Sequence, residues 1–275
     1  MAERLLHVFR NTPLGRETIL QSLYFCKMLG VAIEVYVPES KQFVMYFDHD
    51  MVQVDLDDSY LTTPDSATTR VRQLAAVYGI TPTFFKPKAF TASQLPDIST
   101  AFNFMCCPRS ISDLSTKIGL GHIGPKVRRI IRSSHFPVLM TSSVFKAWES
   151  ITVFYGGSAN ADKALRWGLH LSGITGKPLD LFTYKEGRQE AYFKDRMQAA
   201  GLWDQVQRRM RSWHQADQGV FEEHLFHVPH DALIVVGAYG HSLIKEVLFG
   251  SKMEAIQSWM PNIMLLVGPN CMVGR

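Results

Sequence analysis

The sequence of 275 residues lacks any apolar run near the about 20 residues needed to cross a bilayer. Its start, Met1 to Leu6, holds no apolar segment of the kind found in secretory signal peptides. A net charge of +4 is too small to indicate the dense basic face that nucleic-acid binding usually needs. We therefore expect a cytoplasmic protein with neither membrane nor nucleic-acid partners.

Cysteine is scarce, and the four cysteines form no CxxC pair and no metal-type pairing with histidines. Cys106 and Cys107 are adjacent in an apolar stretch, so we expect buried thiols rather than a redox pair. No motif places a Ser/His/Asp set or a pair of carboxylates for acid and base chemistry. We therefore predict no catalytic residues and no metal ligands, and a regulator is favoured over an enzyme.

Two histidine-containing segments are weighed as metal sites. His224, His227 and His230 recur every three residues on an expected helix, where neighbours in this spacing share a face. Zinc would need a further donor and a closed shell, which the sequence does not evidently supply. The run Asp48-His49-Asp50 is typical of a hairpin turn, which commonly collects such residues. We interpret both sets as solvent-facing residues.

The two halves of the chain repeat one pattern, in which two strand-like apolar runs flank a helical stretch. The runs are 5–9 and 32–37 in the first half, and 151–155 and 179–184 in the second. A strand, a helix and a strand within about forty residues make a βαβ unit. Each half is therefore expected to form a parallel sheet flanked by helices.

The ends of the halves also match. Each half closes with a helical stretch that stops before a proline, Pro137 or Pro261, and then a short apolar strand. The first half is longer by about twenty residues, and alternating apolar residues between Gln42 and about Asp65 predict a β-hairpin there. We expect a first domain over 1–145, with an insertion around 42–65, and a second domain over 146–275.

The second half ends with three glycines that carry the clearest functional signal. The apolar run 233–236 leads into Gly237-Ala238-Tyr239-Gly240, and Gly250-Ser251 follows nine residues later, a spacing of G-x2-G-x9-G-S. Glycine lets backbone N–H groups approach a ligand, and a helix that begins there presents unpaired N–H groups to an anion. We predict that this loop binds a phosphate. Ser251 and Glu254 also fit a capping box, in which the serine merely starts a helix.

A duplicated α/β unit that ends in this motif resembles the universal stress protein family in its tandem form. The resemblance implies two Rossmann-like units of the adenine-nucleotide alpha-hydrolase type, each with a five-stranded parallel sheet flanked by helices. It also implies ATP or a related adenine nucleotide as the ligand of the second unit. The implied contacts are Gly156, Gly157, Ser158, Thr183, Val236, Gly237, Gly240, His241, Gly250, Ser251 and Lys252.

The sequence departs from the family pattern in both halves. Gly156 stands where the family commonly has an aspartate, so a Mg²⁺ ion loses an obvious oxygen ligand and is doubtful here. In the first half, residues 107–110 replace the glycine loop, which predicts a degenerate site. Arg10 or Asn11 would stand near the missing aspartate of that half, and either favours an anion over a metal. The literal GxGxxG at 119–124 lies too far from a strand to be a dinucleotide fingerprint.

We therefore predict a cytoplasmic stress-response regulator whose second domain binds ATP or a related adenine nucleotide. The two domains are expected to pack as an intramolecular pseudo-dimer, with a homodimer and an unidentified protein partner also considered. One alternative is an interaction module that binds no nucleotide and keeps the glycine loop as architecture. Another is a slow ATPase, which would need a base and usually a metal near the loop.

Overall fold

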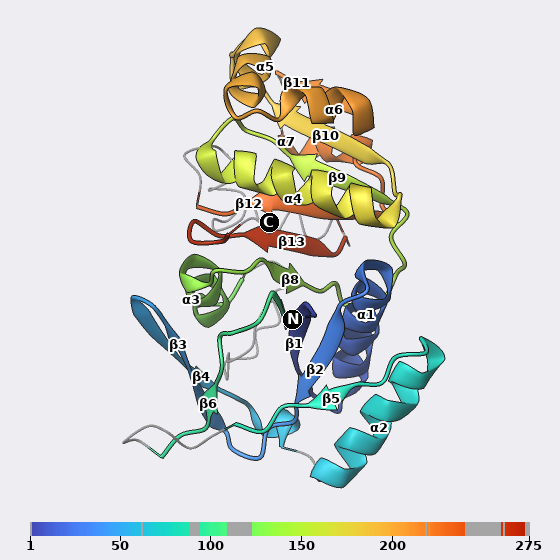
Figure 1. Ribbon diagram of the computed structural model, residues 1–275, viewed down its shortest axis with the longest axis vertical. Helices are drawn as coiled ribbons and strands as arrows, with labels where there is room; N and C mark the ends of the chain where they lie inside the picture. Colours follow the sequence, from blue (N-terminus) through green and yellow to red (C-terminus); the bar gives the residue numbers. More distant parts are fainter. Residues whose placement is uncertain are drawn as a thin grey trace. The chain divides into compact units, whose positions relative to one another are not determined.

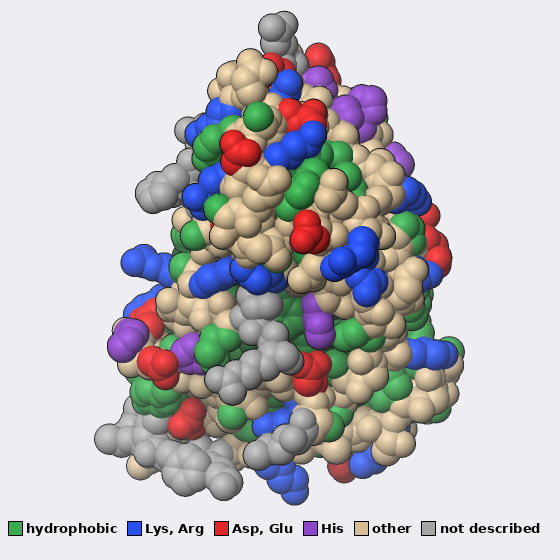
Figure 2. Space-filling view, turned by 45° about the horizontal axis from the view of Figure 1, so that its top comes forward, with side chains coloured by type: hydrophobic (Ala, Val, Ile, Leu, Met, Phe, Trp, Pro, Cys, Tyr) green, Lys and Arg blue, Asp and Glu red, His purple; other side chains and the backbone are tan. Residues whose placement is uncertain are grey.

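The computed structural model divides the chain into two compact units that meet in sequence between Lys146 and Ala147. Unit 1 precedes this junction and unit 2 follows it (Figure 1). The structure describes residues 2–61, 63–87, 94–108, 123–217, 219, 221–239, 260 and 262–272. On the face drawn in Figure 2, basic and acidic side chains are interspersed, in keeping with the small net charge of +4.

Unit 1 is built on a parallel sheet of five strands in the order β8-β7-β1-β2-β5. The strands are β1 (Arg4–Val8), β2 (Ala32–Tyr36), β5 (Thr83–Phe84), β7 (Phe104–Cys107) and β8 (Val138–Met140). The helices are α1 (Pro13–Leu29), α2 (Pro64–Val77) and α3 (Pro125–Ser133). Every residue of β7 and β8 is buried, as expected for a parallel sheet covered on both faces.

The predicted hairpin of unit 1 is confirmed. Strands β3 (Gln42–Phe47) and β4 (Asp50–Asp55) pair antiparallel, and β6 (Asp97–Ile98) joins β3 to make a second, three-stranded sheet. A 3₁₀ turn, η1 (Asp58–Tyr60), follows. The facing pairs Phe43–Val54 and Met45–Val52 are fully buried, so the alternation in the sequence corresponds to one apolar face of the hairpin.

Unit 2 repeats this strand order with five parallel strands, β11-β10-β9-β12-β13. The strands are β9 (Ser150–Phe154), β10 (Leu179–Tyr184), β11 (Met210–Ala216), β12 (Ala232–Gly237) and β13 (Met264–Val267). The helical segments are α4 (Ala159–Thr175), α5 (Glu190–Ala199), α6 (Trp203–Arg209), α7 (Phe221–His224) and the 3₁₀ turn η2 (Leu225–His227). The predicted α/β fold with parallel sheets and flanking helices is confirmed.

Helices α1 and α4 begin and end in the same way in the two units. The side chain of Thr12 caps α1 by accepting from the N–H of Gly15 at 3.1 Å, and Ser158 caps α4 by accepting from Ala161 at 3.2 Å. Gly30 and Gly176 end these helices in the left-handed conformation, each with a φ of 68°. Both helices therefore run 17 residues from the carboxyl end of one strand to the next strand.

Candidate functional site

The topology of unit 2 locates the candidate site. From β9 the chain passes to β10 and β11 on one side of the sheet, and then to β12 and β13 on the other. The strand order thus reverses between β9 and β12. Ligands of open parallel sheets bind at such a reversal, outside the carboxyl ends of the strands. The loops that leave β9 and β12 flank this point, and both carry predicted contact residues.

The loop after β12 begins where the strand lies very close to α4. Gly237 is the last residue of β12, and a Cβ atom there would come within 2.4 Å of the Asn160 carbonyl oxygen and 2.8 Å of the Ala161 nitrogen. Only glycine fits this contact. The Asn160 side chain donates to the carbonyl of Ala238 at 2.6 Å, which fixes the start of the loop. Val236 is buried within the strand.

Five further contact residues were predicted in the glycine loop. Its members Gly240, His241, Gly250, Ser251 and Lys252 lie outside the described residues. The contacts of Gly237 are therefore the direct structural information on this motif, and they assign that glycine a packing role.

The loop after β9 forms the other side of the candidate site. Gly157 has a φ of +73°, a left-handed conformation that favours glycine, and a Cβ atom there would also lie 3.0 Å from the Tyr192 ring. The Gly157 carbonyl accepts from Arg196 Nε at 3.1 Å. Gly156 precedes this turn, and Ser158 follows it as the cap of α4. The three predicted residues therefore form a tight turn that leads directly into a helix N-terminus.

A small polar network supports this turn, and the sequence analysis missed it. Asp162, in the first turn of α4, accepts from the Tyr155 hydroxyl at 2.8 Å and pairs with Arg196 at 3.5 Å. Burial raises the pKa of Asp162. An acidic residue four positions after a cap serine was the available sequence signal. Its partner Arg196 comes from α5, and spacing along the chain does not indicate that contact.

Thr183 has a structural side chain. It is fully buried near the end of β10, and its hydroxyl donates to the Tyr155 carbonyl at 3.0 Å while accepting from Trp213 Nε1 at 2.9 Å. The hydroxyl thus connects three neighbouring segments at the carboxyl edge of the sheet. Because the hydroxyl makes both of these internal hydrogen bonds, the predicted ligand contact of Thr183 would have to come from its backbone.

In unit 1 the corresponding reversal lies between β1 and β7. Arg10, in the loop after β1, forms an ion pair with Asp57 at 3.1 Å and lies over the Tyr60 ring at 5.0 Å. Residues 109–110, the end of the segment that replaces the glycine loop, lie outside the described residues. Arg10 is therefore held by residues that follow the hairpin, and Asn11 is the predicted anion contact that remains available.

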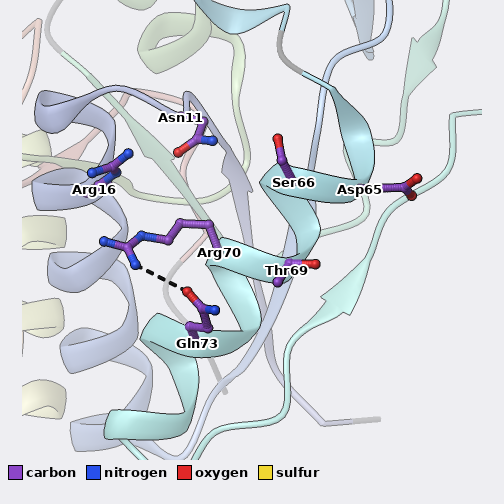
Figure 3. A pocket seen from close by; sticks show the side chains of 7 residues that line it. All are labelled: Asn11, Arg16, Asp65, Ser66, Thr69, Arg70 and Gln73. Atoms are coloured by element: carbon purple, nitrogen blue, oxygen red, sulfur yellow. Dashed lines mark hydrogen bonds between the residues drawn. The ribbon is translucent and has the colours of Figure 1, made fainter.

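Asn11 lines a pocket of about 610 Å³ on the surface of unit 1 (Figure 3). Arg16 from α1 and Arg70 from α2 extend into the space between the two helices, whereas Asp65 points away from it. Arg70 donates to Gln73 at 3.2 Å. The Nε atoms of both arginines and Asn11 Oδ1 are buried without a hydrogen-bond partner. The two arginine side chains of this lining suit a small anion. The pocket was not predicted because α2 supplies most of its residues.

In the Asp48-His49-Asp50 run, which the sequence offers as a possible metal site, Asp50 has structural partners. Asp50, in the hairpin of unit 1, accepts from Arg129 and from the Ser133 hydroxyl of α3, the latter at 2.8 Å. These hydrogen bonds, chiefly that from Arg129, lower the pKa of Asp50 to about 2.

Cys106 and Cys107 are buried free thiols, as predicted. Within the described residues, no helix combines the length and apolar character that a membrane crossing requires.

Comparison with known proteins identifies one curated relative and several solved structures. No family model matches the chain. The universal stress protein Slr1230 from Synechocystis sp. (strain ATCC 27184 / PCC 6803 / Kazusa) is 28% identical over 147 residues, which span 50% of this chain and 48% of that protein. The match therefore extends over about half the length of this curated relative.

Solved structures share the fold over nearly the whole chain. A universal stress protein from Archaeoglobus fulgidus DSM 4304 has a TM-score of 0.61 at 16% identity, with 96% of each chain covered. A putative universal stress protein from Pseudomonas aeruginosa UCBPP-PA14 has a TM-score of 0.54 at 11% identity, with 98% of this chain and 94% of that chain covered. The chain is thus similar to a universal stress protein in sequence over half its length, and it shares the fold of such proteins over nearly all of it.

Proposed function

We propose that unit 2 binds ATP or a related adenine nucleotide at the carboxyl edge of its sheet, between the loops that leave β9 and β12. Binding would regulate a stress response in the cytoplasm. The reversal of strand order between β9 and β12 is the observation that carries the proposal. Gly237, the first glycine of the G-x2-G-x9-G-S spacing, ends β12 at this point.

The start of α4 supplies the positive end of the proposed site. A helix N-terminus offers unpaired N–H groups and a partial positive charge to a phosphate. The turn at Gly156 and Gly157 brings the chain into this helix without side chains that would fill the space. Asp162 adds a carboxyl group nearby, but its ion pair with Arg196 offsets its charge. The proposal therefore relies on main-chain N–H groups and needs no Mg²⁺.

A second function is favoured by one specific observation. The contact between Gly237 and the first turn of α4 explains why that position is glycine without any ligand. The chain would then be an interaction module in which the loop is architectural. A slow ATPase is a third outcome, and sustained phosphate release above the blank would identify it.

Isothermal titration calorimetry with ATP and AMP tests the proposal. The wild-type protein is compared with Gly240→Val, which adds a branched side chain to the second glycine of the motif, and with Gly173→Ala as a matched control. Gly173 is near the end of α4, away from the carboxyl edge, and a Cβ atom there would meet its nearest neighbour at 3.5 Å. We expect saturable heats for the wild type and the control, and binding at least about tenfold weaker for Gly240→Val, a loss of 1.4 kcal/mol or more.

Two results would contradict the proposal. The first is equally weak heats for all three proteins, and the second is unchanged affinity in Gly240→Val. Mass spectrometry of small molecules released from heat-denatured protein provides an independent check, because a bound adenine nucleotide would be released on unfolding.

A further inference from the structure

Three histidines from separate segments come together on the surface of unit 2. His214 lies on β11, His224 is the last residue of α7, and His227 is the last residue of η2. One ring nitrogen from each histidine lies within 4.8 Å of those offered by the other two. His214 and His224 are half-buried, and His227 is exposed. This histidine cluster differs from the set expected from the sequence, because His230 does not belong to it and His214 does.

Apolar packing holds β11 and the continuous stretch α7–η2 together. β11 is the outermost strand of the unit 2 sheet, and α7 and η2 belong to the connection that leads from it to β12. Phe221 of this connection contacts the rings of Phe182 and Tyr184, at centroid distances of 5.9 and 5.5 Å. Tyr184 also donates its hydroxyl to the carbonyl of Gly219 at 2.9 Å. The histidines therefore meet at positions set by other residues.

Ring stacking leaves one buried nitrogen of His214 without a hydrogen-bond partner. His214 stacks on Phe182 at 5.4 Å and on His227 at 4.0 Å, so its ring lies between two others. Its Nε2 atom is nevertheless buried without a hydrogen-bond partner. A buried polar atom without a partner is unfavourable. A metal ion that accepts the nitrogen lone pair would remove this cost.

We propose that His214, His224 and His227 form a binding site for a divalent zinc ion. Imidazole nitrogens are common zinc ligands, and three of them leave a fourth position for water or a carboxylate. Glu223, which precedes His224 in α7, is a candidate carboxylate for that position.

Zinc binding requires the ring of His227 to leave its stacked position on His214, where the two rings are 21° from parallel. Zinc–nitrogen bonds of about 2.0–2.1 Å in a tetrahedral site place two ligand nitrogens about 3.4 Å apart, so the ligand atoms must draw together. His227 is exposed, and its ring can turn toward the others without loss of core packing. The bound ion would fasten the β11–β12 connection to the edge strand of the sheet. This site is independent of the proposed nucleotide site.

Direct titration of the full chain, made without a polyhistidine tag, tests this site. Co²⁺ is added to metal-free protein and its visible absorption is followed, and Zn²⁺ then displaces it. His227→Gln removes the exposed ligand and is expected to leave the fold intact. His230→Gln changes a histidine three positions further along, outside the cluster, and is the matched control. Thermal unfolding with and without Zn²⁺ is measured on the same proteins.

We expect one tightly bound Zn²⁺ per wild-type chain and per His230→Gln chain, with a higher unfolding temperature when zinc is present. His227→Gln is expected to bind at least about tenfold more weakly, since loss of a ligand should cost no less than loss of an outer-shell partner. Equal affinity in wild type and His227→Gln would overturn the proposal. Failure of the wild type to bind Co²⁺ or Zn²⁺ at micromolar concentrations would overturn it as well.

Discussion

The contact between Gly237 and α4 makes a quantitative prediction for Gly237→Ala. The new methyl group would lie 2.4 Å from the Asn160 carbonyl oxygen and 2.8 Å from the Ala161 nitrogen. Both are backbone atoms, so neither can swing aside as a flexible side chain would. The first turn of α4 must therefore move away from β12, or the strand must shift.

The magnitude follows from two terms. Overpacking of a tight contact costs about 1–3 kcal/mol. Movement of α4 also weakens the hydrogen bond from Asn160 to the carbonyl of Ala238, worth about 0.5–1.5 kcal/mol. We expect the free energy of unfolding of unit 2 to fall by about 2–4 kcal/mol. Nucleotide affinity should also fall, because the helix N-terminus would no longer face the proposed site.

Urea unfolding followed by tryptophan fluorescence measures this effect selectively. All five tryptophans follow Lys146 in the sequence, so the signal reports on unit 2. Gly173→Ala on the same helix is the control, and it should raise stability by about 0.5–1 kcal/mol, because alanine is the better helix former and the new methyl group would make only ordinary van der Waals contact with Arg209, at 3.5 Å. If Gly237→Ala unfolds at the wild-type urea concentration, the close packing of β12 on α4 is wrong.

Three further predictions concern buried polar groups. Burial lowers the pKa of His7 to about 3 from 6.5, so its unfolded state binds the proton more readily; stability is full above pH 6.5 and should fall by up to about 1.4 kcal/mol per pH unit toward pH 3. Urea unfolding followed by circular dichroism at pH 7 and pH 5 should show this loss of stability in the wild type and not in His7→Gln. The same change of stability with pH in both proteins would refute the assignment to His7. Arg211→Ala should destabilise unit 2 by about 2–3 kcal/mol, because the Asp180 carboxylate is 5% exposed and accepts from Arg211; urea unfolding with Arg211→Lys as a milder control checks this, and no change would contradict it. Burial raises the pKa of Cys106 to about 12 and that of Cys271 to about 12, so a thiol reagent should modify the native protein slowly and the denatured protein rapidly; rapid reaction of the native protein would contradict the burial.

Local patterns in the sequence predicted much of the fold. The apolar runs became the central strands because residues of a covered parallel sheet are buried on both faces. Gly30 and Gly176 mark the ends of α1 and α4, since the left-handed position after a helix favours glycine. The alternation of apolar residues in β3 and β4 predicted the hairpin because successive side chains of a strand point to opposite faces. Pairing of the two units as a pseudo-dimer, a homodimer and a protein partner stay predictions.

Contacts between distant segments could not be read from spacing. Arg196 reaches Gly157 and Asp162 from another helix, and the sequence offers no register between α5 and the loop after β9. His214 joins His224 and His227 because β11 is followed by a connection that folds back on it. Helical spacing drew attention to His230 instead, since it treats all three positions as one continuous helix. The structure ends η2 at His227.

Hydrogen–deuterium exchange of the full chain with and without ATP tests the central claim most directly, because it reports where the ligand binds. The account predicts slower exchange in peptides that cover residues 155–162 and 237–251, and unchanged exchange in the corresponding loop of unit 1 at residues 9–16. Protection confined to unit 1, or saturable ATP binding with no protection at either loop of unit 2, would contradict it.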